Sequence, residues 1–311
     1  MTSNHNVMFG RQCAISGLAC CLMLIGACGP RGGDQAPVGE SGADRGAATD
    51  SGKPFCLELS SARDRVLLGE PVTLMVGLRN CSEENVEVRD LLRPEYVLLS
   101  VRIAHPQFEQ EQAYYPPVRR DGRGAGYVEL APGAAITEFV PVYFGRDGWQ
   151  LGAPGSYTFQ AEYFVDDLSL VSNTVAIDVE IPAREADLAA ANALMSAGAA
   201  TYFFLGGGDA QGATELRAVS AEFPDTPWAA YAELGLAMAV AGDRGIAARS
   251  GECERLEASL LQIEQDWIVA FRGFEILSNC LSESGHNADV QRVTAEFLSR
   301  HPPARAALQL E

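Results

Sequence analysis

The sequence changes character near residue 182, and this change limits the folds that the chain can adopt. Between Pro54 and Pro182, short runs such as "FCLELSS" and "EPVTLMVGLRN" alternate apolar and polar residues. Such alternation is typical of β-strands with one buried face. From Ala183 to Glu311, alanine-rich runs typical of helices take over. We therefore expect a β domain over 54–182 followed by an all-α domain over 183–311.

Turn signals divide the β domain into short strands. They include Leu68–Pro71, Ala131–Gly133 and Ala153–Gly155, which contain Gly and Pro. The spacing predicts an antiparallel sandwich. The expected strands are 55–61, 70–80, 85–90, 96–104, 126–130, 136–144, 156–165 and 173–181.

Three segments of this domain carry a family resemblance. "GEPVTLMVGLRN" at Gly69–Asn80, "GSYTFQAEY" at Gly155–Tyr163 and "SNTV" at Ser172–Val175 resemble strands of bacterial immunoglobulin-like domains. The resemblance implies an immunoglobulin-like β-sandwich. It implies little about function, because such domains serve as binding modules, spacers and chaperone-like caps.

The all-α domain is expected to contain six helices that pair into three hairpins. They cover 186–205, 212–224, 226–243, 253–265, 266–284 and 287–303. "FPDTPWAAYAELGLAMAVAG" at Phe223–Gly242 resembles the junction between two tetratricopeptide repeats. That resemblance implies a helical hairpin array with a concave face for a partner. An irregular helical bundle is the alternative.

Large aromatic residues in the helical domain are candidates for that concave face. They are Trp228, Tyr231, Trp267 and Phe271. The alternative is that they form the core, since large aromatic residues at helical spacing are usually buried.

The N-terminus has the pattern of a secretory signal. Residues 1–12 contain one clear positive charge, Arg11, and the apolar block Cys13–Leu24 is shorter than the roughly 20 residues that span a bilayer. Ile25–Cys28 resembles the lipobox of bacterial lipoprotein precursors. The resemblance implies a signal peptide over 1–27 and a lipid on Cys28. The alternative is an ordinary cleaved signal with an incidental cysteine.

The lipoprotein resemblance also implies a location. Gly29 stands where an Asp tends to retain such proteins at the inner membrane, so we expect an outer-membrane anchor with the protein facing the periplasm. Residues 28–53 would connect the lipid to the folded part. This segment holds one Val and no larger apolar residue, so we expect a disordered tether.

Cys13, Cys20 and Cys21 would be removed with the signal peptide. Besides Cys28, four cysteines remain, and they form two pairs in sequence, one in each expected domain. In an exported protein an even number of cysteines favours disulfides. We predict Cys56–Cys81 and Cys253–Cys280. The alternative is four buried free thiols.

One long connection in the β domain combines aromatic and basic residues. Ala104–Gly126 is too long for a hairpin loop and contains the candidate binding residues Tyr114, Tyr115, Arg119, Arg120 and Arg123. Aromatic residues and arginines are enriched at interface hot spots. The segment is thus a candidate recognition loop for an acidic or carbohydrate partner, or else a solvated excursion whose arginines pair with the protein's own acidic residues.

Charge and motif content exclude several functions. The chain has 23 basic and 41 acidic residues, a net charge of −18, which argues against nucleic-acid binding and electrostatic adhesion to anionic lipid. HExxH, GxSxG, SxxK, Walker and GxGxxG motifs are missing from the sequence. The Gly-rich Phe204–Gly212 lacks the Lys-Ser/Thr of a phosphate loop and is interpreted as a helix stop. We predict no catalytic residues, metal or cofactor.

These observations favour a lipid-anchored envelope protein that acts as a scaffold or adaptor for an unidentified protein partner. One alternative is a ligand-binding or protease-inhibitor-like sandwich that uses the loop over 104–126. An enzyme with a dispersed site is a second alternative, because pairs of catalytic carboxylates leave no sequence motif.

Overall fold

The computed structural model describes residues 54–89, 91–120, 126–165, 168–208, 210–241, 250–263 and 266–307. The expected signal peptide, the expected lipid-attachment residue Cys28 and residues 29–53 of the expected tether lie outside these ranges. Residues 47–311 form one compact unit. Below, "β region" means residues 54–182 and "helical region" means residues 183–311.

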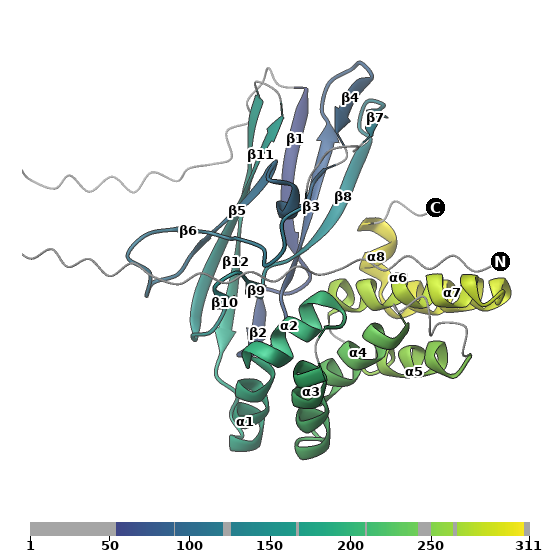
Figure 1. Cartoon of the computed structure of the whole chain (residues 1–311). Helices are drawn as coiled ribbons and strands as arrows, with labels where there is room; N and C mark the ends of the chain where they lie inside the picture. The colour runs from purple at the N-terminus through teal and green to yellow at the C-terminus, as the bar shows by residue number, and fades with distance from the viewer. Residues whose placement is uncertain are drawn as a thin grey trace, which may run out of the picture. The chain divides into compact units, whose positions relative to one another are not determined.

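The β region contains two main sheets and two short ribbons (Figure 1). The three-stranded sheet has the order β1-β3-β8, from Phe55–Ser61, Thr73–Asn80 and Ala135–Pro141. The five-stranded sheet has the order β2-β12-β11-β5-β6, from Arg65–Leu67, Leu168–Glu180, Gly155–Val165, Leu99–Ala104 and Gln112–Ala113. The ribbons pair β4 (Val86–Arg89) with β7 (Tyr127–Leu130) and β9 (Phe144–Gly145) with β10 (Gly148–Trp149).

The eight expected strand segments all contain a strand, because their alternating apolar residues point into one core. Leu74, Val76 and Leu78 of β3 have no exposed surface, and Phe159 of β11 is equally buried. One additional short strand departs from the expected antiparallel arrangement. Strand β2 pairs in parallel with the end of β12, since the chain reaches it by crossing from the other sheet after β1.

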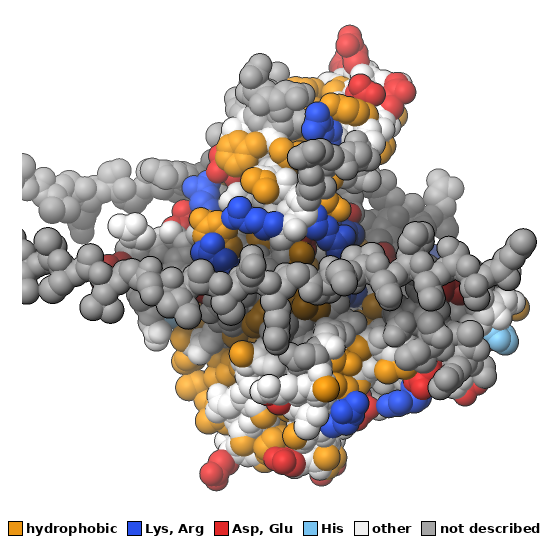
Figure 2. Space-filling view, viewed as in Figure 1, with side chains coloured by type: hydrophobic (Ala, Val, Ile, Leu, Met, Phe, Trp, Pro, Cys, Tyr) orange, Lys and Arg blue, Asp and Glu red, His pale blue; other side chains and the backbone are white. Residues whose placement is uncertain are grey.

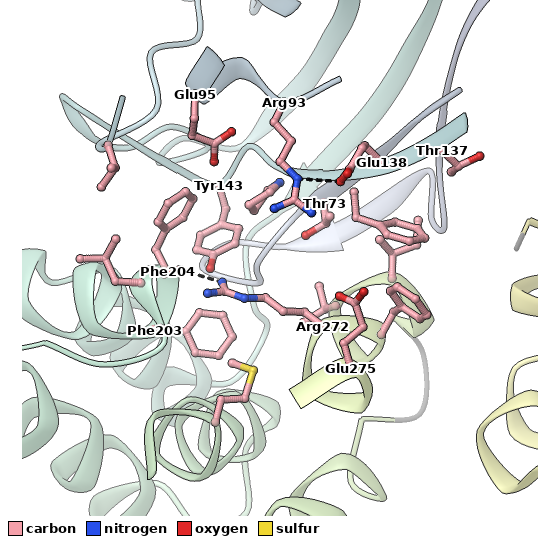
Figure 3. Close-up of a pocket in the computed structure, with 18 of the residues that line it drawn as sticks. Thr73, Arg93, Glu95, Thr137, Glu138, Tyr143, Phe203, Phe204, Arg272 and Glu275 are labelled. Atoms are coloured by element: carbon pink, nitrogen blue, oxygen red, sulfur yellow. Dashed lines mark hydrogen bonds and ion pairs between the residues drawn. The ribbon is translucent and has the colours of Figure 1, made fainter. Parts of the chain in front are cut away.

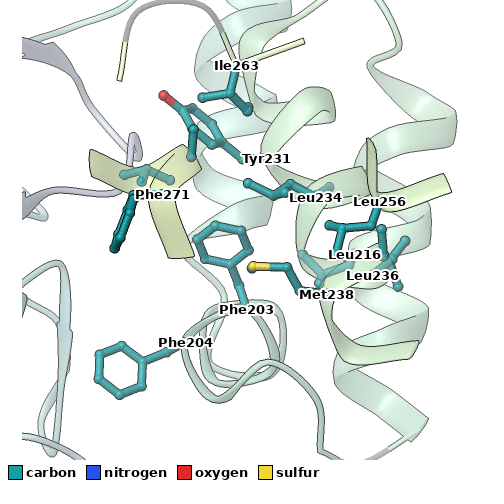
Figure 4. Packing of buried hydrophobic residues seen from close by; sticks show 14 of the residues in the cluster. Phe203, Phe204, Leu216, Tyr231, Leu234, Leu236, Met238, Leu256, Ile263 and Phe271 are labelled. Carbon is teal, nitrogen blue, oxygen red and sulfur yellow. The ribbon is translucent and has the colours of Figure 1, made fainter. Parts of the chain in front are cut away.

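The helical region has eight helices among the described residues, where six were expected. They are α1 (Glu185–Leu194), α2 (Ala197–Leu205), α3 (Ala210–Glu222), α4 (Pro227–Ala241), α5 (Ser250–Leu260), α6 (Trp267–Glu283), α7 (Asn287–Arg300) and α8 (Pro302–Ala307). Figure 4 shows Phe203, Leu216, Leu234 and Met238 converging in their shared core.

Two expected helices are divided by local chemistry. The segment 186–205 forms two helices bent by 66°, because the Ser196 side chain accepts a hydrogen bond from the Ala199 amide and starts α2. The segment 287–303 breaks at His301, since Pro302 and Pro303 lack the amide hydrogen that would continue α7. The predicted helix stop after Leu205 is confirmed, with Gly206 in the left-handed conformation at φ 67°.

Among the described helices, none by itself has the length and apolar character needed to cross a membrane. The bent pair α1 and α2 meets that test only when both helices are taken together.

The β region and the helical region pack against each other and share buried surface. Tyr143 and Phe144 of the β region belong to the same hydrophobic cluster as the helices. Phe139 of β8 packs edge-on against Trp267, with ring centroids 5.7 Å apart, and lies 4.6 Å from the Phe271 ring. The change of character near residue 182 therefore separates two kinds of secondary structure that pack together.

Both predicted disulfides are confirmed. Cys56–Cys81 joins the start of β1 to the residue after β3, and Cys253–Cys280 joins α5 to α6. Each bond has a Cα–Cα distance of 5.9 Å. The alternative of four free thiols is excluded in this structure.

Candidate binding cleft

A cleft of about 460 Å³ lies between the β region and the helical region (Figure 3). Strand β8 and the segment before β5 line one side, while α2 and α6 line the other. This volume falls within the ~300–1,000 Å³ range typical of ligand sites. Its aromatic lining comes from both regions: Phe139, Tyr143, Phe203, Phe204 and Phe271.

A short 3-10 turn, Pro94–Tyr96, places two charged residues at the cleft. Arg93 precedes the turn and Glu95 lies within it. The turn ends at Val97, which has φ 72° and is 63% exposed. A β-branched residue is strained in this left-handed conformation. The structure therefore holds an unfavourable backbone conformation directly beside the cleft.

The charged groups of the cleft are partly paired. The Arg93 Nε donates a hydrogen bond of 2.8 Å to Glu138 Oε2 on β8. Burial alone would lower the pKa of Arg93, but Glu138 first, and then the charges of Glu95 and Glu275, raise it above its ordinary value. Three carboxylates thus stabilise the charged form of one guanidinium.

The helical side contributes a second arginine. Arg272 of α6 donates a 2.7 Å hydrogen bond from Nη1 to the Phe204 carbonyl at the end of α2. Burial raises the pKa of nearby Glu275 above its ordinary value, although the charges of Arg93 and then Arg272 oppose the rise. Figure 3 shows the Tyr143 hydroxyl directed toward Arg272. Burial raises the pKa of Tyr143, so this phenol stays protonated.

Glu95 differs from the other cleft carboxylates. Its Oε2 is shielded from solvent and has no hydrogen-bond partner among the described residues. The negative charge of Glu95 helps to raise the pKa of Arg93, but that guanidinium is already bonded to Glu138. Arg120 also lines the cleft, but its side chain is exposed, where solvent and salt weaken its attraction. The carboxylate of Glu95 can therefore accept a hydrogen bond from a ligand in the cleft.

The candidate recognition loop is only partly available for binding. Tyr114 is 4% exposed, and its hydroxyl donates to the carbonyls of Pro141 and Phe144, so its proposed role in contacting a partner was wrong. It anchors the loop to the β region. Arg123 lies outside the described residues.

The other described candidates of that loop, Tyr115, Arg119 and Arg120, are accessible. Tyr115 is 39% exposed, and the guanidinium carbons of Arg146 and Arg119 lie 4.7 and 5.9 Å from its ring centroid. Arg119 and Arg120 are both exposed. Figure 2 shows several basic side chains exposed on the β region, acidic side chains at its tip, and both acidic and basic side chains on the helical region.

The aromatic candidates of the helical region are core residues. Trp228, Tyr231 and Trp267 are 0%, 4% and 8% exposed, so the prediction that they contact a partner was wrong. Trp228 and Tyr231 point into the core that α4 shares with its neighbours, as the alternative interpretation predicted. Phe271 is also buried, but it reaches the cleft.

Sequence reasoning missed the charged residues that distinguish the cleft: Arg93, Glu95, Glu138, Arg272 and Glu275. They come from segments as far apart as residues 93 and 275, and each is ordinary in its local sequence. No motif in the sequence indicates that these five residues lie close together. Within the described ranges, no group of three or more His, Cys, Asp or Glu side chains could hold a metal ion.

Comparison with known proteins gives little further information. No known protein family and no curated protein matches the chain. Among solved structures, a β-glucosidase from Erythrobacter marinus is 14% identical over 40% of this chain and 15% of its own, with a TM-score of 0.25. The chain thus corresponds to a small part of that enzyme's length.

Two smaller structures give similar values. A CARDB domain from Pyrococcus furiosus is 14% identical over 40% of this chain and 94% of its own, with a TM-score of 0.22. The sporulation control protein Spo0M from Bacillus subtilis is 13% identical over 46% of this chain and 56% of its own, with a TM-score of 0.27. Similarities at this level carry no conclusion about what the protein binds.

Proposed function

We propose that this protein is a lipid-anchored envelope lipoprotein that acts as an adaptor and holds a segment of a partner protein in the cleft. The observation that carries the proposal is the cleft itself, which combines aromatic lining with charged groups from two different regions. Pockets of this size, apolar with a few polar groups, are the usual place for ligand binding.

The anchor and the architecture support the same function. The lipobox-like Ile25–Cys28 suggests a lipid on Cys28 and a place in the outer membrane, facing the periplasm. The resemblances to immunoglobulin-like and tetratricopeptide-like domains suggest a module for protein interaction, since both kinds of domain commonly serve that role. On this proposal the chain works without a cofactor and without chemistry of its own.

The loop over 104–126 belongs to the same proposal. Val118 and Arg120 line the cleft beside residues of α2 and α6. A ligand-binding sandwich that uses this loop and an adaptor that uses the helical region would therefore share one site.

The test is an affinity pull-down from detergent-solubilised envelope with a variant that narrows the cleft. Leu205 at the end of α2 is 44% exposed and lines the cleft, so Leu205→Trp adds bulk there without disturbing the core. Val171→Trp is the matched control, because Val171 on β12 is 51% exposed and does not line the cleft.

We expect the wild type and Val171→Trp to recover the same partner and Leu205→Trp to recover much less of it. Equal recovery by all three proteins would refute a role for the cleft. Recovery of no specific partner by the wild type would refute the adaptor function.

A further inference from the structure

We propose that the cleft selects partner segments that present an arginine or lysine side chain, and that Glu95 is the residue that binds this cation. The inference rests on the proposed function, because it names the chemistry of the segment that the cleft holds.

The charge arrangement of the cleft favours a cationic guest. Arg93 is bonded to Glu138, and Arg272 is bonded to the Phe204 carbonyl and lies near Glu275. The guanidinium groups of Arg93 and Arg272 are thus already bonded to acceptors, whereas one oxygen of Glu95 has no partner among the described residues. At Arg93 or Arg272 an anionic guest would have to displace existing partners, and at Arg120 solvent and salt would weaken its attraction to the exposed side chain. A cationic guest at Glu95 would satisfy a group that is left over.

Glu95 Oε2 is shielded from solvent, so its lack of a hydrogen-bond partner has an energetic cost. A carboxylate removed from water without hydrogen bonds raises the free energy of the folded protein. A guanidinium or ammonium group placed against Glu95 would form a charge-assisted hydrogen bond, which is about twice as strong as a neutral one. The binding of a cation at Glu95 therefore offsets the desolvation cost that this carboxylate carries when the cleft is empty.

The aromatic lining fits the rest of such a side chain. Lysine and arginine carry apolar stems that pack on apolar surface while the charged end bonds elsewhere. Figure 3 shows Glu95 above Tyr143 and Phe204, so a side chain that enters over these rings can place its charged end at Glu95. A small inorganic cation would leave this aromatic surface unused.

The charge of the whole protein supports a basic partner. The net charge of −18 attracts basic segments at long range and repels acidic ones. Long-range attraction and the local site thus select the same partner chemistry.

The experiment is a selection of random peptides displayed on phage against the immobilised protein, followed by affinity measurements on the enriched peptides. Glu95→Gln removes the proposed cation-binding charge and keeps the shape of the side chain. Glu87→Gln is the matched control, because Glu87 on β4 is exposed, lies away from the cleft and gives the same change in net charge. Leu205→Trp reports whether a peptide binds in the cleft.

We expect enriched peptides to carry a central Arg or Lys, to lose affinity on Leu205→Trp, and to bind Glu95→Gln about thirtyfold more weakly than Glu87→Gln. Replacing the central basic residue of the peptide by Gln should cause a similar loss on the wild type and little further loss on Glu95→Gln.

Two results separate the inference from the function on which it rests. Cleft-dependent peptides that are neutral or acidic, or that bind Glu95→Gln and Glu87→Gln equally well, would overturn the inference and leave the proposed function standing. A selection with no cleft-dependent peptide at all would overturn both.

Discussion

A buried ionic cluster joins the two regions, and the cost of removing its single cation can be worked out from the structure. Arg63 follows β1, and its Nη2 lies 3.0 Å from Glu70 Oε2 and 3.6 Å from Asp266 Oδ2 at the start of α6. The three side chains are 14%, 7% and 6% exposed. Two buried carboxylates thus depend on one guanidinium.

Arg63→Met keeps the apolar stem but leaves both carboxylates without their cation. Removing one partner of a buried ion pair costs about 3–5 kcal/mol. Because folded domains have total stabilities of about 5–15 kcal/mol, we expect a clear loss in the free energy of unfolding. Urea unfolding followed by circular dichroism at about pH 7 measures it, with midpoints and slopes compared with the wild type.

The same reasoning predicts how this loss depends on pH. Burial raises the pKa of Asp266 above its ordinary 3.8, although Arg63 opposes the rise. A carboxyl whose folded pKa is raised stabilises the fold most in its protonated form, and this contribution is lost as pH rises through the folded pKa. Without Arg63 the pKa rises further. The cost of Arg63→Met should therefore be largest at neutral pH and shrink as the pH falls and the carboxyl takes up a proton.

Two variants complete the experiment. Arg65→Met breaks the exposed pair with Glu180, whose side chains are 66% and 49% exposed, and should cost less than about 1 kcal/mol. Asp266→Asn removes one of the two carboxylates and keeps a side chain able to cap α6, so it should be close to neutral at pH 7. A cost of Arg63→Met below about 1 kcal/mol, or one that is as large in acid as at neutral pH, would refute the electrostatic account.

Three further predictions concern packing, backbone strain and the anchor. Gly235→Ala would place a Cβ 2.5 Å from the buried Phe203 ring, so we expect a loss of about 1–3 kcal/mol in thermal or urea unfolding. Val97→Gly relieves the left-handed strain and should stabilise the protein by about 1 kcal/mol, which a lower stability would contradict. Cys28→Ala should leave an uncleaved precursor without lipid label, whereas Cys20→Ala should be processed normally, as radiolabelled fatty acid would show.

The strands could be predicted well because their signal is local. In "FCLELSS" the residues Phe55, Leu57 and Leu59 are buried and Cys56 and Glu58 are exposed, as the alternation requires. The two disulfides followed from the number of cysteines and their separations of 25 and 27 residues. In both cases the information lies within a few tens of residues, where chain geometry leaves few alternatives.

Which aromatic side chains are buried and which are exposed could not be predicted from local sequence. Tyr114 and Tyr115 are neighbours of the same type, yet one is buried against β8 and the other stacks with arginines on the surface. Trp228 and Trp267 lie on helices whose outer and inner faces depend on where the neighbouring helices pack. Residue type indicates that such residues contribute either to core packing or to partner binding, but it does not show which of these two roles each residue has.

The sequence by itself thus predicted the main strands and helices in their order and the two disulfide pairs. Only the tertiary structure decided where a partner could bind. Arg93 and Glu95 precede β5, Glu138 lies on β8, and Arg272 lies on α6, and the packing of the β region against α2 and α6 brings them to one cleft. The reason is physical: helical and strand periodicity act over neighbouring residues, whereas the environment of a charged group depends on side chains that the fold brings from anywhere in the chain.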